Sequence, residues 1–199
     1  MLTTLLDPKH LLEVLGYAGY FIAIFSESGL FFGIIFPGDS LLVTAGLIAS
    51  AGHLNIWILL VGGLICAILG DNVGYYTGKK LGPRIFTKEE SWFFKRSYIE
   101  KSEIYFKKHG PKTIIFARFI PFVRTFAPML AGVGNMEYKK FFLYNIIGGF
   151  IWMVTLLLSS YFLGTLIPTL DQYVLPIAGG IFIVSFLPLM YKIIKTRFF

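Results

Sequence analysis

The stretch TIIFARFIPFVRTFAPMLAGVG, residues 113–134, decides how this chain must fold. It is apolar enough to enter a membrane, yet it carries two arginines, Arg118 and Arg124. Two prolines, Pro121 and Pro128, interrupt it. A charge at the bilayer centre costs about 2.5–3.5 kcal/mol on insertion scales, so both guanidiniums must face a polar cavity or a ligand. Because prolines remove backbone donors, and non-helical backbone at this depth must be buried in protein or line water, the stretch predicts a broken, re-entrant hairpin.

The composition of the whole chain is that of a membrane protein. Of its 199 residues, 56% are hydrophobic and 18% are aromatic, and the mean hydropathy is +0.72. Soluble domains are about 45–50% apolar, so we expect one integral membrane domain over residues 1–199. The net charge of +7 comes from basic residues in loops beside apolar segments, which is the positive-inside pattern and disfavours a nucleic-acid partner. The single cysteine, Cys66, excludes an intrachain disulfide and is interpreted as a packing residue.

A second interrupted apolar segment covers residues 17–50. It contains Glu27, and a Pro-Gly pair at positions 37 and 38 is followed directly by Asp39. A Pro-Gly pair followed by an acidic residue is typical of a turn and a helix N-cap. We therefore expect a second re-entrant hairpin at about residues 25–46.

Three further apolar stretches are long enough to cross a bilayer as single helices, at residues 55–78, 141–164 and 174–191. The first ends in four glycines spaced four residues apart: Gly70, Gly74, Gly78 and Gly82. They lie on one helix face and permit close backbone approach, within one chain or between two chains of a homo-oligomer. Asp71 is adjacent to Gly70, at a position within or near the membrane.

The distribution of basic residues indicates the orientation. A basic connector at about residues 79–112 is expected to be cytoplasmic, together with the clusters at 139–140 and 192–197, if both hairpins are re-entrant. The predicted fold is therefore an all-α integral membrane protein. It is an inverted repeat of two opposed re-entrant helical hairpins, each followed by a transmembrane helix, plus a C-terminal transmembrane helix. Broken segments that match in two halves predict a binding site where they meet.

The two predicted hairpins carry opposite charges. Glu27 and Asp39 belong to the first, Arg118 and Arg124 to the second, and together these four form the candidate substrate site. Arginine stays charged and suits bidentate contact with phosphate, whereas a carboxylate removed from water can take up a proton near neutral pH. We expect the arginines to bind an anionic group, and Glu27, Asp39 and Asp71 to be candidates for proton coupling. The alternative is that the charges form structural ion pairs across the hairpins.

An enzyme is not expected from these residues. The three histidines, His10, His53 and His109, lie in predicted loops or termini, and no Cys/His cluster has the spacing of metal ligands. No glycine-rich phosphate loop follows a strand. The sequence therefore predicts no catalytic residue, no metal and no cofactor.

Several motifs of one family occur together in this chain. They are Glu27 with FPGD at 36–39, GDNVGYYTG at 70–78 and FARFIPFVR at 116–124. Further matching positions are Pro128, Ala131, Gly132, Met136, Phe141, Asn145, Gly148 and Trp152. Over about residues 15–165 the chain resembles the DedA family of membrane proteins, which is related to the eukaryotic VTT-domain lipid scramblases.

The resemblance implies a multi-pass protein of the bacterial cytoplasmic (inner) membrane with two opposed re-entrant loops. By position, the family's essential acids fall on Glu27 and Asp39, and its essential arginines on Arg118 and Arg124. Family members are linked to moving lipids between leaflets, notably to recycling undecaprenyl phosphate, and others to phosphatidylethanolamine. The proton motive force and cell-envelope stress are also associated with the family.

The expected function is therefore a lipid transporter, a flippase that returns undecaprenyl phosphate across the cytoplasmic membrane. The expected partners are membrane lipids that carry a phosphate. Three alternatives stay open: a flippase or scramblase for phosphatidylethanolamine or phospholipids in general, a proton-coupled transporter of ions or small solutes, and a structural or regulatory membrane protein.

Overall fold

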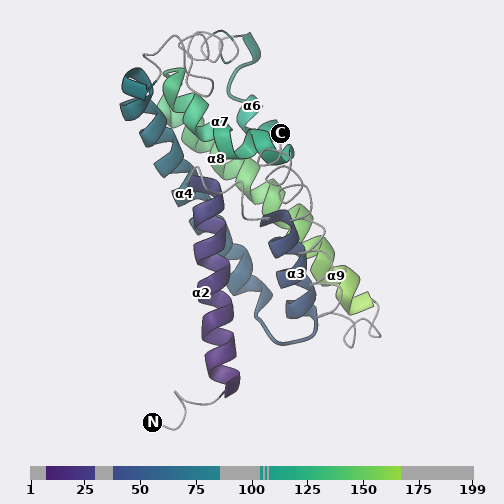
Figure 1. Cartoon of the computed structure of the whole chain (residues 1–199). Coiled ribbons are helices and arrows are strands. Elements are labelled where there is room, and N and C mark those ends of the chain that lie inside the picture. Colours follow the sequence, from purple (N-terminus) through teal and green to yellow (C-terminus); the bar gives the residue numbers. More distant parts are fainter. Residues whose placement is uncertain (1–7, 30–37, 86–103, 105, 107, 167–199) are drawn as a thin grey trace, which may run out of the picture. The chain divides into compact units, whose positions relative to one another are not determined.

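The computed structural model describes residues 8–29, 38–85, 104, 106 and 108–166, and in these residues the chain is helical with no strand (Figure 1). The helices are α2 (Pro8–Gly29), α3 (Gly38–Ser50), α4 (Ile56–Ile85), α6 (Thr113–Ala117), α7 (Pro121–Val133) and α8 (Tyr138–Met153). A π-helical turn, η2 (Val154–Leu158), and α9 (Ser159–Leu166) follow. Most of the predicted connector at 79–112 and the predicted C-terminal span at 174–191 lie outside the described residues.

Among the described residues, two helices are long and apolar enough to cross a membrane. They are Ile56–Leu81, with 26 residues, and Tyr138–Leu166, with 29 residues, the latter formed by α8, η2 and α9 without interruption. At 1.5 Å per residue the shorter one is about 39 Å long, more than the thickness of a bilayer's hydrocarbon core. These helices confirm that the predicted stretches at 55–78 and 141–164 are long, apolar helices.

The stretch at residues 113–134 folds as two short helices with a break between them. α6 ends at Ala117, and α7 begins at Pro121, where the missing N–H of proline is no loss because the first turn has no partner for it. Ile120, just before Pro121, has an extended backbone with φ −113° and ψ 108°. Pro128 lies inside α7 without ending it, so the prediction that both prolines interrupt the segment is wrong for Pro128.

The segment predicted as the first hairpin also contains helices on both sides of a gap. α2 ends at Gly29, residues 30–37 lie outside the described part, and α3 begins at Gly38 with Asp39 in its first turn. The helix begins at the glycine of the Pro-Gly pair, close to the predicted start, and Asp39 lies inside its first turn and not at the N-cap. The re-entrant course of both hairpins, and their inverted repeat, stay predictions.

The described chain divides into two compact units, each assembled from separate stretches. The first contains residues 8–24, 38–63 and 153–166, and the second contains residues 25–29 and 64–152 except for the parts not described. Whether the two units act as the single domain expected for residues 1–199 stays a prediction.

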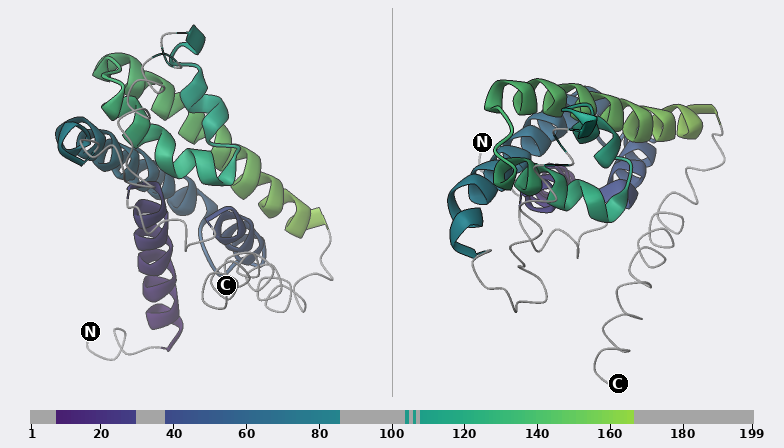
Figure 2. Two further views of the ribbon diagram at one scale, coloured as in Figure 1. Left: turned by 45° about the horizontal axis from the view of Figure 1, so that its top comes forward. Right: turned by 90° about the horizontal axis from the view of Figure 1, so that it is seen from above.

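In the first unit, α3 packs closely on α9, and the two helices lie side by side in Figures 1 and 2. Small residues make this contact possible. A Cβ added at Gly46 would lie 2.5 Å from the carbonyl oxygen of Leu157, and one added at Gly164 would lie 2.7 Å from Cβ of Ser50. Glycine and serine at these positions therefore bring the helix axes together, as in many membrane-embedded helix pairs.

In the second unit, the glycine face of α4 packs within the chain. A Cβ at Gly70 would lie 2.6 Å from the carbonyl oxygen of Phe25, and one at Gly78 would overlap that of Met129. In the same contact, a Cβ at Gly132 of α7 would overlap the carbonyl oxygen of Tyr75. Gly70 and Gly78 thus join α4 to the end of α2 and to α7, and no side chain larger than a hydrogen atom fits at these two positions. A Cβ at Gly74 would lie 3.4 Å from Cβ of Pro128, which is an ordinary contact.

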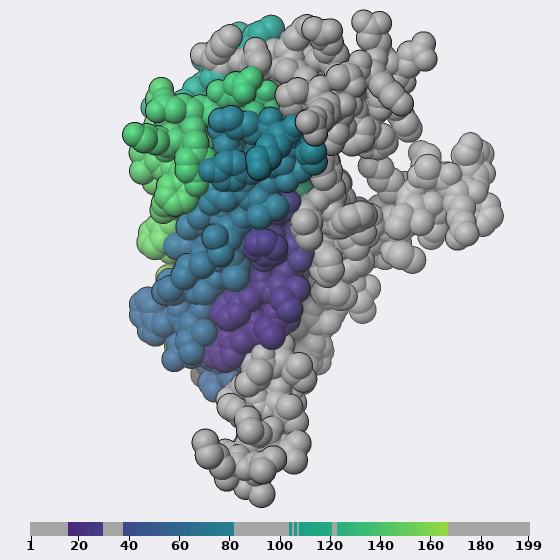
Figure 3. Space-filling view, turned by 90° about the vertical axis from the view of Figure 1, so that its left-hand side faces the viewer, coloured from purple at the N-terminus to yellow at the C-terminus, as the bar shows by residue number. Residues whose placement is uncertain are grey.

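The side of α4 away from these contacts is apolar and exposed. Figure 3 shows this helix, coloured blue to teal, reaching the surface. Its exposed large side chains are Trp57, Ile58, Val61, Ile65, Leu69, Val73, Tyr76 and Leu81. A continuous apolar surface of this kind is expected for a helix that faces lipid.

Candidate functional site

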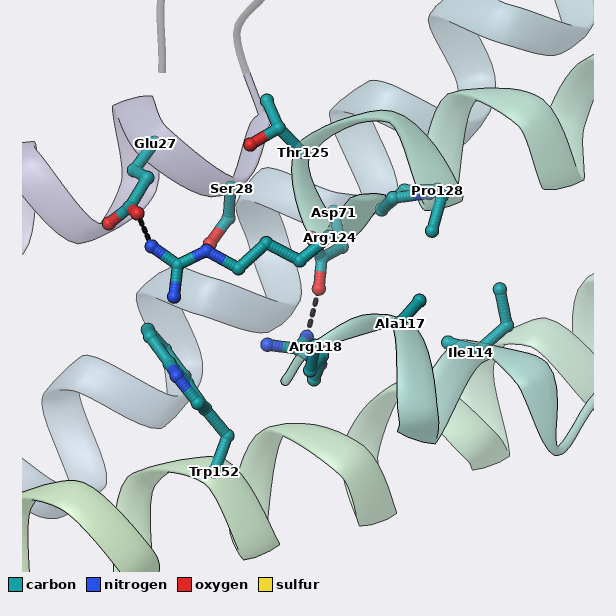
Figure 4. A pocket seen from close by; sticks show the side chains of 11 residues that line it. Glu27, Ser28, Asp71, Ile114, Ala117, Arg118, Arg124, Thr125, Pro128 and Trp152 are labelled. Carbon is teal, nitrogen blue, oxygen red and sulfur yellow. Dashed lines mark hydrogen bonds and ion pairs between the residues drawn. The ribbon is translucent and has the colours of Figure 1, made fainter. Parts of the chain in front are cut away.

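Five side chains from different parts of the second unit surround one small cavity (Figure 4). Glu27 comes from the last turns of α2, and Asp71 from the middle of α4. Arg118 lies in the turn after α6, Arg124 in the first turn of α7, and Trp152 near the end of α8. Two carboxylates, two guanidiniums and an indole therefore meet inside an apolar helical protein.

Arg118 forms the first of two buried ion pairs. Its Nη2 donates to Oδ2 of Asp71 and to Oδ1 of Asn145. The side chains of Arg118 and Asp71 are only 7% and 5% exposed, and Asn145 is fully buried. Because α6 ends at Ala117, Arg118 lies just beyond the helix, while its neighbours Ile114 and Ala117 stay in the hydrophobic core.

Arg124 forms the second ion pair, with Oε1 of Glu27. The two side chains are 11% and 4% exposed. The backbone N–H of Arg124 donates to the carbonyl oxygen of Ile120 at 3.0 Å, so this arginine sits where α7 begins. The pair joins α2 to α7, the two segments in which the sequence predicts opposed hairpins.

Trp152 contacts both guanidiniums. The centre of its ring lies 5.0 Å from Cζ of Arg124 and 5.8 Å from Cζ of Arg118. Both distances are within the range of a cation–π interaction. Because Trp152 is 2% exposed, the two contacts are shielded from water, which strengthens them.

The cavity between these groups is very small in this structure. It leaves room for about 10 Å³, roughly the least that holds one water molecule. Three polar atoms in this region are buried without a hydrogen-bond partner among the described residues: Oε2 of Glu27, Nε of Arg118 and Nδ2 of Asn145. Buried polar atoms are rarely left unpaired, so this cluster retains capacity for a further polar ligand.

The structure brings together four of the five candidate residues, namely Glu27, Asp71, Arg118 and Arg124. Asp39 lies in the first turn of α3, in the other unit, and does not line this cavity. The acid paired with Arg118 is Asp71, which the sequence placed only among the candidates for proton coupling. The ion pairs themselves agree with the structural alternative, while the roles of all five residues stay predictions.

Two residues of the cluster, Asn145 and Trp152, were not assigned to the site from the sequence. With Gly148 and Gly149 they are spaced i, i+3, i+4 and i+7, which places them on one face of α8. The spacing could have revealed a common face. It could not have shown that arginines from elsewhere in the chain lie on it.

The acids of this cluster are already paired with arginines, which does not suit a metal ion. Within the part of the chain that the structure describes, no three histidine, cysteine or acidic side chains gather as a metal site would require.

Comparison with known proteins identifies the family. The VTT domain matches residues 36–162. The chain is 43% identical to Protein DedA of Escherichia coli K12 over 183 residues, covering 91% of this chain and 83% of that protein. It is 44% identical over 167 residues to an uncharacterised membrane protein of Mycobacterium leprae, covering 84% and 74%.

A more distant relative is the inner membrane protein YqjA of Escherichia coli K12, 33% identical over 150 residues, with coverage of 74% and 67%. No solved structure was found to match the chain. The VTT-domain match includes the stretches that carry Asp71, Arg118, Arg124 and Trp152. The chain therefore belongs to the VTT-domain family of membrane proteins, the family of Protein DedA.

Proposed function

We propose that this protein is a transporter of the bacterial cytoplasmic membrane that moves a phosphate lipid, undecaprenyl phosphate, between leaflets. Arg118 and Arg124 bind the phosphate, and the polyprenyl tail stays in the bilayer. The observation that carries the proposal is the pair of buried guanidiniums at one cavity of an apolar, helical protein. The relative YqjA is an inner membrane protein by name, which supports the location.

The two ion pairs at this small cavity correspond to a state of the transporter without bound lipid. Each guanidinium is occupied by a carboxylate, Arg118 by Asp71 and Arg124 by Glu27, so the acids hold the positions that phosphate oxygens would take. A phosphate monoester carries about −1.5 to −2 charges at neutral pH, close to the charge of the two carboxylates it replaces. Exchange of substrate for carboxylate therefore keeps the buried cluster near neutrality, which limits its electrostatic cost.

Protons supply a way to drive this exchange. A protonated carboxyl no longer neutralises its arginine, so proton uptake on both Glu27 and Asp71 releases the two guanidiniums for the lipid, and proton loss expels the lipid again. Asp39, in the other unit, stays a third candidate for proton coupling. The two interrupted segments, α2 with α3 and α6 with α7, are proposed to be the opposed re-entrant hairpins through which the site opens alternately to each side.

One observation favours a second candidate function. A cavity of about 10 Å³ suits a small ion or solute better than a lipid headgroup unless it opens. On that account the protein is a proton-coupled transporter of small solutes, and the arginines serve only to hold the helices. The two functions differ in whether phosphate-lipid movement depends on Arg124.

The test is lipid movement in liposomes that contain the purified protein. Movement of undecaprenyl phosphate and of phosphatidylethanolamine between leaflets is measured for the wild type and for Arg124→Ala. Arg124→Lys keeps the charge but loses the bidentate geometry, which guards against a folding defect in the alanine variant. Lys139→Ala removes an exposed positive charge on α8 and serves as the matched control.

We expect undecaprenyl phosphate to move in the wild type and in Lys139→Ala, and to stop in Arg124→Ala. Arg124→Lys should retain its fold and move the lipid more slowly. Normal movement in both Arg124 variants contradicts the proposed mechanism. Equal movement of both lipids indicates a general scramblase, and proton flux that requires a solute but no phosphate lipid indicates the second function.

A further inference from the structure

α8 presents one face to both arginines. Gly148 and Gly149 give the guanidinium of Arg118 its room, because a Cβ at Gly148 would lie 3.1 Å from Cδ of Arg118 and one at Gly149 would lie 3.5 Å from its Cζ. Asn145, one turn before these glycines, accepts a hydrogen bond from the same guanidinium. Trp152, one turn after them, contacts Arg118 and Arg124 together (Figure 4).

The acids and the indole hold the arginines in different ways. Glu27 pairs with Arg124 and Asp71 pairs with Arg118, so each acid holds one guanidinium from a helix of its own. Trp152 contacts both guanidiniums on one ring. When a carboxylate is protonated or moves away, its ion pair with the arginine is lost. The attraction of a guanidinium to an aromatic ring does not depend on the charge of the carboxylates. The ring therefore keeps two like charges close to each other in the state that receives the ligand.

Because both guanidiniums contact the ring of Trp152, they lie near each other, and this decides which phosphate they suit. A phosphate monoester carries nearly two negative charges and has three terminal oxygens, so it can satisfy two arginines at once. A phosphodiester has a single negative charge and two terminal oxygens, which one bidentate arginine can satisfy. Two arginines held together in a dry site therefore favour the monoester, since a diester leaves one buried positive charge without a partner.

We infer that Trp152 is a positioning residue that makes the site selective for lipids with a phosphomonoester headgroup over lipids with a phosphodiester headgroup. This inference rests on the proposed function, because it assumes that the arginines bind a lipid phosphate. Asn145 supports the same arrangement by fixing the guanidinium of Arg118 from the other end of the α8 face.

The test compares two lipids that differ in the headgroup alone. Binding of dioleoyl phosphatidic acid, a monoester, and of dioleoyl phosphatidylglycerol, a diester, is measured in phosphatidylcholine vesicles that contain the full chain. The proteins are the wild type, Trp152→Leu and Trp152→Phe. Trp57→Leu is the matched control, because Trp57 is 66% exposed on α4 and has no part in the cluster.

We expect the wild type and Trp57→Leu to prefer phosphatidic acid. In Trp152→Leu the ratio of the two affinities should fall on the order of tenfold, through loss of phosphatidic acid binding, which is the size of a desolvated cation–π contact. The affinity ratio of Trp152→Phe should lie between those of the wild type and of Trp152→Leu, because a phenyl ring attracts cations less than an indole. The ratio is the informative quantity, since a merely structural role would weaken the binding of both lipids alike.

Two results overturn the inference. One is a folded Trp152→Leu protein with the wild-type ratio, and the other is an equal loss of both lipids. If the wild type binds neither lipid, the inference fails. The proposed function fails only if the wild type also moves no undecaprenyl phosphate in liposomes, so the two failures are distinguished by the wild type in the two assays.

A second measurement tests the inference if the Trp152→Leu protein does not fold. Trp57→Phe and Trp92→Phe together leave Trp152 as the single tryptophan of the chain, so that its fluorescence reports on the site. Phosphatidic acid should change the emission, because the guanidiniums on the ring exchange carboxylate for phosphate. Phosphatidylglycerol should change it less. Unchanged emission while phosphatidic acid is bound contradicts the inference.

Discussion

Asp71 and Arg118 are 47 positions apart in the sequence and form an ion pair that is almost wholly removed from water. The carboxylate belongs to the 30-residue helix α4, and the guanidinium to a turn between two short helices. Asn145 adds a hydrogen bond to the same guanidinium. Removal of either charge would therefore leave the other one buried without its ion-pair partner.

We predict that Arg118→Ala destabilises the protein by about 3–5 kcal/mol, because it leaves the carboxylate of Asp71 buried without a cation. Thermal unfolding in detergent measures the loss. Removing both charges, in Arg118→Ala with Asp71→Ala, should restore much of the stability, since no uncompensated charge is left. A double variant as unstable as the single one would show that packing of the arginine side chain, and not its charge, is what matters.

Exchange of the charges between Glu27 and Arg124 separates a structural role from a transport role. The double variant Glu27→Arg with Arg124→Glu should be more stable than either single variant, because it re-forms an ion pair between α2 and α7. Lipid movement should nevertheless be lost, since the phosphate then meets a carboxylate at the start of α7. Thermal unfolding and the liposome assay are run on the same preparations. Full transport by the exchanged pair would contradict a carrier role for Arg124.

Gly132 of α7 is predicted to be intolerant of even the smallest side chain. A Cβ there would overlap the carbonyl oxygen of Tyr75 and lie 2.8 Å from the backbone nitrogen of Lys79. Because both are backbone atoms, α4 and α7 must move apart, and we expect Gly132→Ala to cost about 1–3 kcal/mol in thermal unfolding.

The control for this substitution is Gly19→Ala in α2. A Cβ at Gly19 meets nothing within 4 Å, so alanine should be neutral or stabilise by about 0.5–1 kcal/mol through helix propensity. Equal effects at the two positions would mean that close packing of α4 on α7 does not limit stability.

Glu137, just before α8, gives a prediction on pH. The hydrogen bond from Lys140 at 2.9 Å, followed by the charges of Lys140 and Lys139, lowers the pKa of Glu137 below its ordinary value. A group whose pKa is lower in the folded state contributes stability above its unfolded pKa and loses it as the pH falls through the folded pKa.

The melting temperatures of the wild type and Glu137→Gln should therefore differ slightly at neutral pH and converge in acid. The difference is small because the pair is solvent-exposed. Lipid movement by Glu137→Gln should keep the wild-type pH dependence, since Glu137 lies outside the cluster. A changed pH profile of transport would place the titrating group outside the buried acids.

The sequence alone determined the local features of this protein. Apolar length predicted the two long helices, and the spacing of Gly70, Gly74 and Gly78 predicted a packing face, because both depend on residues near in sequence. The break before Pro121 followed from the geometry of proline. The cost of a charge in a membrane marked Glu27, Asp71, Arg118 and Arg124 as residues that need partners.

Only the tertiary structure decided which partners they have. Asp71, and not Asp39, pairs with Arg118, while Asn145 and Trp152 complete the cluster. These choices depend on how far each helix is rotated and shifted where it packs on the next, which the glycine contacts between α4 and α7 and the close approach of α6 to α8 determine. Periodicity specifies which residues share a face of one helix. It carries no information on which faces meet, because that depends on the packing of side chains far apart in the chain.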